Sequence, residues 1–170
     1  ALLPSFNQSY DVSQLTQVSQ VSKWQARGKM MIAGNGEKVS GYFYWSQNGD
    51  SFDFSLNTLI GINMFEITVS PNGATLKVDG KTHTDASAER LVSRLTDYEL
   101  PINQLRWWVL GEISPDDNAQ FIDKNMSQDG KLLGLTVPYG DQVWAIDYRS
   151  WQNVKQFSLP KSMNVRSGSN

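Results

Sequence analysis

The sequence predicts a mainly β protein, an antiparallel meander interrupted by two short helices, and three observations carry that prediction. Asn-Gly or Asp-Gly pairs, the favoured turns of tight β-hairpins, recur at residues 35–36, 48–49, 72–73, 79–80 and 129–130. Polar and apolar residues alternate between these turns, which is the period of a half-buried strand. Apolar residues recur at helical spacing in two mid-chain segments. At 170 residues the chain is expected to form a single domain over 1–170.

The aromatic segment 39–45 is the most informative of the predicted strands. Phe43 and Trp45 point to one face, and Tyr42 and Tyr44 to the other, which predicts that both faces of this strand are covered. Further strands are expected over residues 51–56, 65–69, 119–127, 131–137 and 142–150. The polar tail from Val165 is expected to be frayed.

Two helices are expected between the strands. The first has an apolar stripe at Ala88, Leu91, Val92 and Leu95. Its predicted N-cap is Thr84 or Asp85. The second is expected to open at Pro101 and to stop at Gly111, and a weaker one is expected over 11–24. Such helices can cover the concave face of a curved sheet, with either an ordinary packed core or an apolar cleft between the two layers.

Composition excludes several classes of function. A formal net charge of −2 argues against a nucleic-acid partner, and the absence of cysteine excludes disulfides, thiolate metal sites and a cysteine nucleophile. The single histidine, His83, is expected to be an ordinary surface strand residue rather than a ligand or base. No phosphate-binding loop, dinucleotide fingerprint or membrane-spanning apolar run occurs. No cofactor, metal or catalytic residue is therefore predicted.

The segment between two of the predicted strands has an unusual composition for a hairpin tip. Leu59, Ile60 and Ile62 surround Gly61 at a position where polar residues are the rule. Either the loop folds back onto the core, or it exposes an apolar tip for contact with a membrane or a partner.

The segment from Leu100 to Gly111, with the sequence LPINQLRWWVLG, resembles the lid-helix signature of the LolB family, the outer-membrane lipoprotein receptors of bacterial lipoprotein sorting. Weaker similarities occur in the same order along the chain, at Arg27-Gly28, at the aromatic strand ending in Trp45, at Trp144 and at Leu159-Pro160. Together they span nearly the whole chain.

The resemblance implies an open antiparallel β-barrel covered by a helical lid, with a hydrophobic cavity between them. It also implies a non-enzymatic carrier, expected to be monomeric, that receives acylated lipoproteins from the periplasmic carrier LolA and inserts them into the inner leaflet of the outer membrane. Members are anchored by a lipidated N-terminal cysteine and face the periplasm. Because this chain has no cysteine, it is expected to be a trimmed, soluble mature form. The family continues past the late proline into another strand that ends in a Trp, whereas this sequence ends in a polar tail, so either the sheet closes differently or a C-terminal strand is missing.

The resemblance also assigns roles to particular positions. The membrane-delivery loop would comprise Leu59, Ile60, Gly61 and Ile62, with Ile60 at the position of the family's protruding apolar residue and Leu59 where a proline is common. Apolar periodicity and family position together nominate residues that would contact the acyl chains, namely Trp45, Leu91, Leu95, Trp108 and Trp144.

Three alternatives remain at the level of sequence. A soluble carrier of the LolA type would share the fold, and a lipocalin-like binder of a small apolar ligand would also explain the aromatic residues. A hydrolase could use paired carboxylates at Asp116 and Asp117, or at Asp85 and Glu89. A Ser-Pro-Asp-Asp turn and a capped helix start explain those pairs better.

Overall fold

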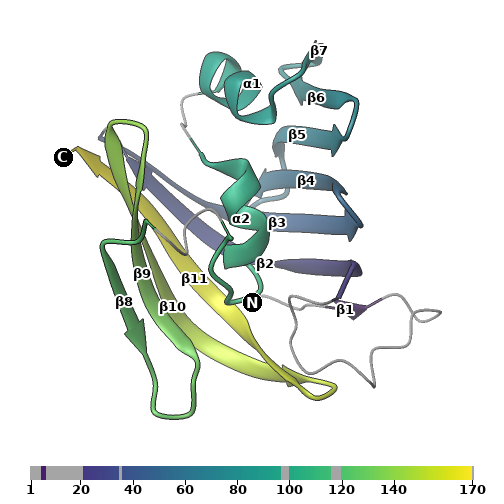
Figure 1. Cartoon of the computed structure of the whole chain (residues 1–170). Coiled ribbons are helices and arrows are strands. Elements are labelled where there is room, and N and C mark those ends of the chain that lie inside the picture. Colours follow the sequence, from purple (N-terminus) through teal and green to yellow (C-terminus); the bar gives the residue numbers. More distant parts are fainter. Residues whose placement is uncertain (1–4, 7–20, 35, 97–99, 116–119, 170) are drawn as a thin grey trace.

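The computed structural model describes residues 5–6, 21–34, 36–96, 100–115 and 120–169. Strands dominate these residues, and the two helices lie within the curve of a strongly bent sheet (Figure 1). The strands are β1 (Ser5–Phe6), β2 (Lys23–Gly34), β3 (Glu37–Asn48), β4 (Ser51–Thr58), β5 (Asn63–Ser70), β6 (Gly73–Val78), β7 (Lys81–Asp85), β8 (Asp123–Met126), β9 (Leu132–Tyr139), β10 (Gln142–Val154) and β11 (Phe157–Ser169). The helices are α1 (Ala88–Leu95) and α2 (Ile102–Trp108).

The strands form one sheet in the order β7-β6-β5-β4-β3-β2-β11-β10-β9-β8, and β1 pairs with β2 beside this path. Neighbours in sequence pair antiparallel, as the hairpin turns predict. The exception is the central pair, because β11 runs parallel to β2, with Met163 opposite Met30. Within the described chain the edge strands β7 and β8 are not joined, so the barrel is open.

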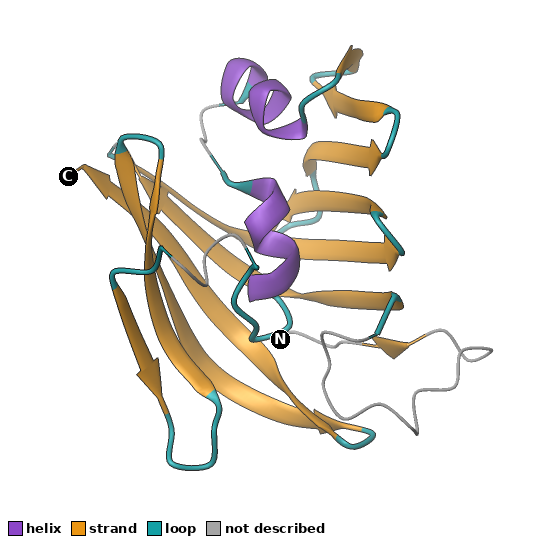
Figure 2. Cartoon of the chain, in the orientation of Figure 1, coloured by secondary structure: helices purple, strands orange, loops and turns teal. Residues whose placement is uncertain are grey.

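The helices connect the two halves of the sheet (Figure 2). The chain leaves β7, passes through α1 and α2, and only then enters β8. Helix α1 packs on β6 and β7 and also contacts α2. The predicted architecture, an open barrel with a helical lid, is therefore confirmed.

Alternation along the strands builds the core. On β4 every second residue is buried, and its polar residues face outward. Phe54 of β4 packs against Phe43, Trp45 and Phe65, with ring centroids 5.3–6.3 Å apart. The concave side of the sheet is consequently apolar.

Several local predictions were wrong at the N-terminal side. The helix expected over 11–24 does not include its last residues, since Trp24 lies in strand β2, and residues 11–20 are outside the described part. The outer face of β3 is not covered, because Tyr42 is 47% exposed. The N-cap of α1 is Ser87, not Thr84 or Asp85.

The C-terminal predictions also need correction. The tail expected to fray from Val165 instead pairs with β10 as far as Ser169. The strand expected over 119–127 is shorter, because β8 covers only Asp123–Met126. The tail forms a strand despite its polar sequence, because it pairs with β10 on one side and with β2 on the other.

Candidate functional site: an apolar interior under the helices and an exposed apolar loop

The sheet wall of the interior is built around Trp45 of β3. Its side chain is fully buried, and its ring stacks on Phe52 at 4.5 Å and on Trp24 at 6.1 Å between centroids. The indole Nε1 donates to Gln47 Oε1 at 2.9 Å, so its one polar group is satisfied in an apolar setting. Gln47 Nε2 in turn donates to the Gly49 carbonyl oxygen at 2.7 Å, which links this wall to the β3–β4 turn.

Helix α1 covers the upper part of this wall. Its apolar stripe places Leu91 and Val92 in fully buried positions, and Leu95 is partly buried against the same core. The Ser87 side chain accepts a hydrogen bond from the Arg90 backbone N–H at 3.2 Å and caps the helix. Arg90 also pairs with Asp85, and that pairing holds the pKa of the Asp85 carboxyl well below its usual range.

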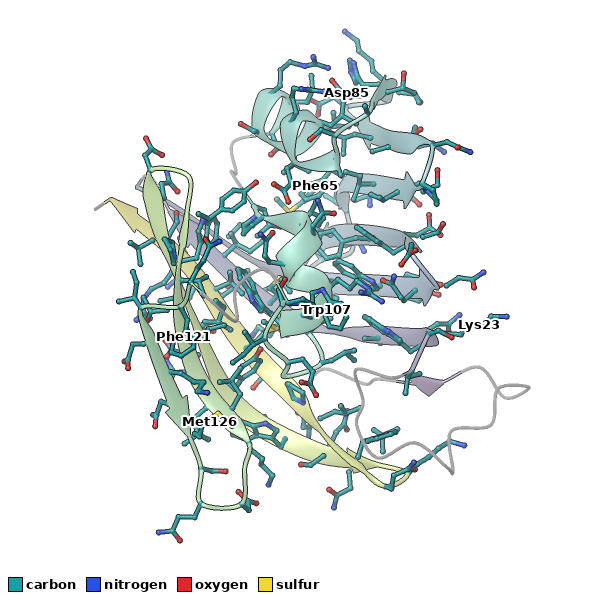
Figure 3. The ribbon with its side chains drawn as sticks, viewed as in Figure 1. Lys23, Phe65, Asp85, Trp107, Phe121 and Met126 are labelled. Carbon is teal, nitrogen blue, oxygen red and sulfur yellow. The ribbon has the colours of Figure 1, made fainter. Side chains whose placement is uncertain are left out.

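Helix α2 is fixed by contacts with both halves of the sheet. Trp108 is fully buried, and its carbonyl oxygen accepts a hydrogen bond from the Tyr148 hydroxyl of β10. Burial raises the pKa of Tyr148, with a further contribution from Glu112. On the other side, Arg106 Nη2 donates to the Gly49 carbonyl oxygen at 3.5 Å, and its guanidinium lies 4.1 Å from the Trp107 ring centroid. Figure 3 shows Trp107 on α2, beside the strands of this half.

The far wall comes from β10, where Trp144, Ile146 and Tyr148 alternate inward. Trp144 is 2% exposed, and its indole Nε1 has no hydrogen-bond partner among the described residues. The surrounding buried residues, which include Val137, Ile146 and Val165, are apolar, so the interior is apolar here as well.

All five sequence-predicted contact residues face the interior: Trp45, Leu91, Leu95, Trp108 and Trp144. Four of them are buried and Leu95 is partly buried. All five belong to, or pack against, a single cluster of buried hydrophobic residues. Sequence reasoning missed Tyr148 and Gln47, which fix the positions of Trp108 and Trp45; the inward register of Tyr148 with Trp144 was available as a signal.

The loop between β4 and β5 projects into solvent. Ile60 is 84% exposed, and Leu59 and Ile62 are also exposed. The turn is internally braced, because Thr58 N–H donates to the Ile62 carbonyl oxygen at 2.8 Å and Gly61 N–H donates to the Thr58 carbonyl oxygen at 2.9 Å. Gly61 has a φ of +88°, a conformation that glycine adopts without strain. A braced turn with three exposed aliphatic side chains is a preformed apolar tip.

The described residues contain no cluster of three or more His, Asp or Glu side chains that could hold a metal ion. His83 lies within β7, opposite Leu76 of β6. Asp85 is engaged by Arg90, and Asp116 and Asp117 are outside the described part. No helix within the described ranges is long and apolar enough to cross a membrane.

Comparisons with known proteins assign the chain to a family. The profile described as "Outer membrane lipoprotein LolB" matches residues 22–170. The chain belongs to the LolB family. It is 31% identical over 147 residues to the outer-membrane lipoprotein LolB of Shewanella amazonensis, covering 86% of this chain and 68% of that protein. It is 29% identical over 154 residues to the corresponding protein of Shewanella baltica, covering 91% and 70%.

Membership assigns the chain to the lipid-anchored lipoproteins of the outer membrane and to a role in lipoprotein localisation. The lid-helix segment that carried the resemblance, from Leu100 to Gly111, contains α2 and its two attachments to the sheet. The segment that indicated the family is therefore also the segment that covers the apolar interior.

Proposed function

We propose that this protein is a non-enzymatic receptor that takes acylated lipoproteins from a LolA-type periplasmic carrier and inserts them into the inner leaflet of the outer membrane, facing the periplasm. The observation that carries the proposal is the pairing of a largely apolar interior under a helical cover with a preformed apolar tip at Ile60. Family membership supports the same function.

The interior suits an acyl chain for energetic reasons. Sheltering a chain of roughly sixteen carbons is worth ~13 kcal/mol at ~0.8 kcal/mol per methylene, before ordering costs. Trp45, Leu91, Leu95, Trp108 and Trp144 supply the apolar surface in this proposal. Because these side chains now pack against one another, loading moves the helices away from the sheet and replaces side-chain contacts by contacts with the ligand.

The loop suits delivery rather than storage. Burying one isoleucine in lipid is worth only ~1.5–3 kcal/mol, which is too little to anchor a protein. It is enough to orient a protein that is already anchored, so that the interior opens toward the bilayer. Transfer then follows increasing affinity from carrier to receptor to membrane and needs no nucleotide.

The first test mixes the purified chain with an acylated lipoprotein bound to the periplasmic carrier, without ATP, and follows the lipoprotein by pull-down. We expect it to move to this protein, because the receptor must bind acyl chains more tightly than the donor does. Retention on the donor, with this chain folded by circular dichroism, would contradict the proposal and favour a donor-type carrier or an unrelated lipid binder.

The second test separates the loop from the interior. Ile60→Glu should leave acyl binding and uptake from the carrier nearly unchanged while delivery to liposomes fails. Ile122→Glu is the matched control, since Ile122 is also an exposed isoleucine, 59% exposed, ahead of β8. Loss of acyl binding in the Ile60 variant, or equal loss of delivery in both variants, would show that the loop has no special role.

The third test addresses the interior residues. An acyl chain carrying a bromine label should quench the fluorescence of Trp45, Trp108 and Trp144 on binding, and single Trp→Phe changes should each remove part of the quenching. Unchanged quenching in all three variants would exclude these residues as ligand contacts.

A further inference from the structure

The outer face of the sheet next to the apolar loop carries a group of cationic and aromatic side chains. Strand register places Lys29 of β2 opposite Tyr42 of β3, and Tyr42 opposite Asn57 of β4, two residues before the turn begins at Leu59. Alternation puts Lys38 on the same face as Tyr42. All three side chains, Lys29, Lys38 and Tyr42, are exposed.

The charges on this face are not neutralised locally. Among the described residues neither Lys29 nor Lys38 forms an ion pair. Arg166 of β11, which like Lys38 lies opposite Ala33, pairs with Asp147 at 2.8 Å. The outward acidic side chains on the next two strands are engaged or face another cation. Asp53 of β4 accepts a hydrogen bond from Thr68, and Glu66 of β5 lies opposite Lys77 of β6.

The cations and the loop also lie at the same end of the sheet. Thr58 is level with Gly41, and Lys38 lies three residues beyond Gly41 in the direction in which β4 runs out, a displacement of about 10 Å along the strand. The turn at 59–62 leaves β4 in that same direction. An apolar tip, an exposed tyrosine and two lysines therefore share one corner of the molecule.

We propose that this corner, formed by the 59–62 turn together with Lys29, Lys38 and Tyr42, is a docking surface for an anionic lipid bilayer. The inference rests on the proposed delivery function and adds a lipid class to it. Aliphatic side chains enter the hydrocarbon, tyrosine rings lie at the interface, and lysine ammonium groups stay among the headgroups. A bilayer presents these layers in that order, whereas an acidic protein surface offers no hydrocarbon for Ile60.

Net charge alone does not explain such binding, because the chain carries a formal charge of −2 and would be repelled by an anionic surface. Binding to an anionic bilayer must therefore depend on where Lys29 and Lys38 lie and not on the net charge of the chain. The matched experiment compares Lys29→Gln/Lys38→Gln with Lys23→Gln/Lys124→Gln, which changes net charge by the same amount. Lys23 is at the opposite end of β2 (Figure 3), and Lys124 is in the edge strand β8.

The measurement is co-flotation of the whole chain with vesicles of phosphatidylcholine alone or with one-quarter phosphatidylglycerol, at low and at physiological salt. The original chain should prefer the anionic vesicles, and the Lys29/Lys38 variant should bind them roughly tenfold or more weakly at low salt. The control pair should bind like the original chain. The difference should shrink as salt rises, because exposed charges are screened.

Equal binding of the two double variants to anionic vesicles would overturn the inference, and so would the absence of an anionic preference in the original chain. The delivery assay distinguishes this from failure of the proposed function. If lipoprotein reaches pure phosphatidylcholine vesicles but the lysines have no effect, delivery stands and the lipid preference is wrong. If the lysines govern vesicle binding but no lipoprotein is delivered, the docking surface stands and the carrier role is wrong.

Discussion

The two helices that cover the interior are held in different ways. Helix α1 has a side-chain cap from Ser87 and an ion pair between Asp85 and Arg90, both formed within its own neighbourhood. Helix α2 has no side-chain cap and depends instead on distant partners, Tyr148 of β10 and Gly49 of the β3–β4 turn. The cap of α1 stays with the helix when it moves, and its ion pair ties it only to the end of β7, whereas both polar contacts of α2 exist only when that helix is docked.

This difference indicates how the cover could open. When α1 moves away from the sheet, the Ser87 cap can move with it. The losses are the burial of Leu91 and Val92 and an ion pair between Arg90, which is largely exposed, and Asp85 at the end of β7. When α2 moves, the Trp108 carbonyl and Arg106 lose their partners as well. We therefore expect α1 to move first on loading and α2 to act as the fixed support.

The largest expected effect comes from removing the side chain that anchors α2. Trp108→Ala leaves a cavity at a fully buried position and should lower the free energy of unfolding by ~3–5 kcal/mol. Urea denaturation followed by circular dichroism measures the change. Trp107→Ala is the control, because Trp107 is only partly buried on the same helix, and its loss should be clearly smaller. Equal losses would mean that Trp108 is not the anchor.

A second effect concerns the turn that follows α2. Gly111 has a φ of +74°, and a Cβ placed there would lie 3.1 Å from Pro160 Cγ of β11. Gly111→Ala should therefore cost ~1–3 kcal/mol through backbone strain and the close contact. Gly140→Ala is the matched control, because Gly140 has a φ of +61° and nothing within 4 Å of its Cβ position. Thermal unfolding measures the fall in Tm of each variant, and the excess fall for Gly111→Ala reports the contact with Pro160 of β11. If Gly111→Ala lowers Tm no more than Gly140→Ala does, β11 does not fix the turn after the helix.

The third effect isolates a single hydrogen bond. Tyr148→Phe keeps the buried ring but leaves the Trp108 carbonyl without this donor, which should cost about 1–2 kcal/mol. Tyr42→Phe, at an exposed position on the outer face, should cost almost nothing. If the two variants unfold at the same denaturant concentration, Tyr148 contributes packing only, and α2 is held less firmly than its contacts indicate.

Sequence patterns predicted the parts of the fold that depend on near neighbours. Alternation around Phe54 and the apolar stripe from Ala88 to Leu95 identified a strand and a helix whose burial the structure confirms. The parallel pairing of β2 with β11 could not be predicted, because no local period connects segments so far apart. For the same reason the polar tail after Val165 was expected to fray, although two neighbouring strands order it.

In the candidate site, too, the residues that follow a local pattern could be predicted, and the contacts between distant elements could not. Trp45 and Leu91 could be placed in the interior from alternation and helical spacing, and the odd composition of the 59–62 loop was visible directly. The hydrogen bond from Tyr148 to Trp108 was not predictable, because it joins two elements whose distance apart is set only by the whole sheet. The N-cap prediction failed because three neighbouring polar residues could all cap, and the ion pair with Arg90 engages Asp85 otherwise.

The smallest expected effect tests the local character of α1. The Arg90 hydrogen bond lowers the pKa of the Asp85 carboxyl in the folded state, so the ionised carboxylate is favoured by folding. Its stabilising contribution is present above the ordinary carboxyl pKa, roughly pH 4, and is lost as pH falls further toward the lowered value. Asp85→Asn should therefore lower Tm slightly at neutral pH, and the difference from the original chain should vanish in acid and shrink with salt, because Arg90 is largely exposed. Asp141→Asn controls for the loss of one acidic charge. An amide oxygen can also accept the hydrogen bond from the Ser87 N–H, so the substitution removes the charge and keeps that bond. The absence of any Tm difference at neutral pH would mean that Asp85 acts through this bond and not through its charge.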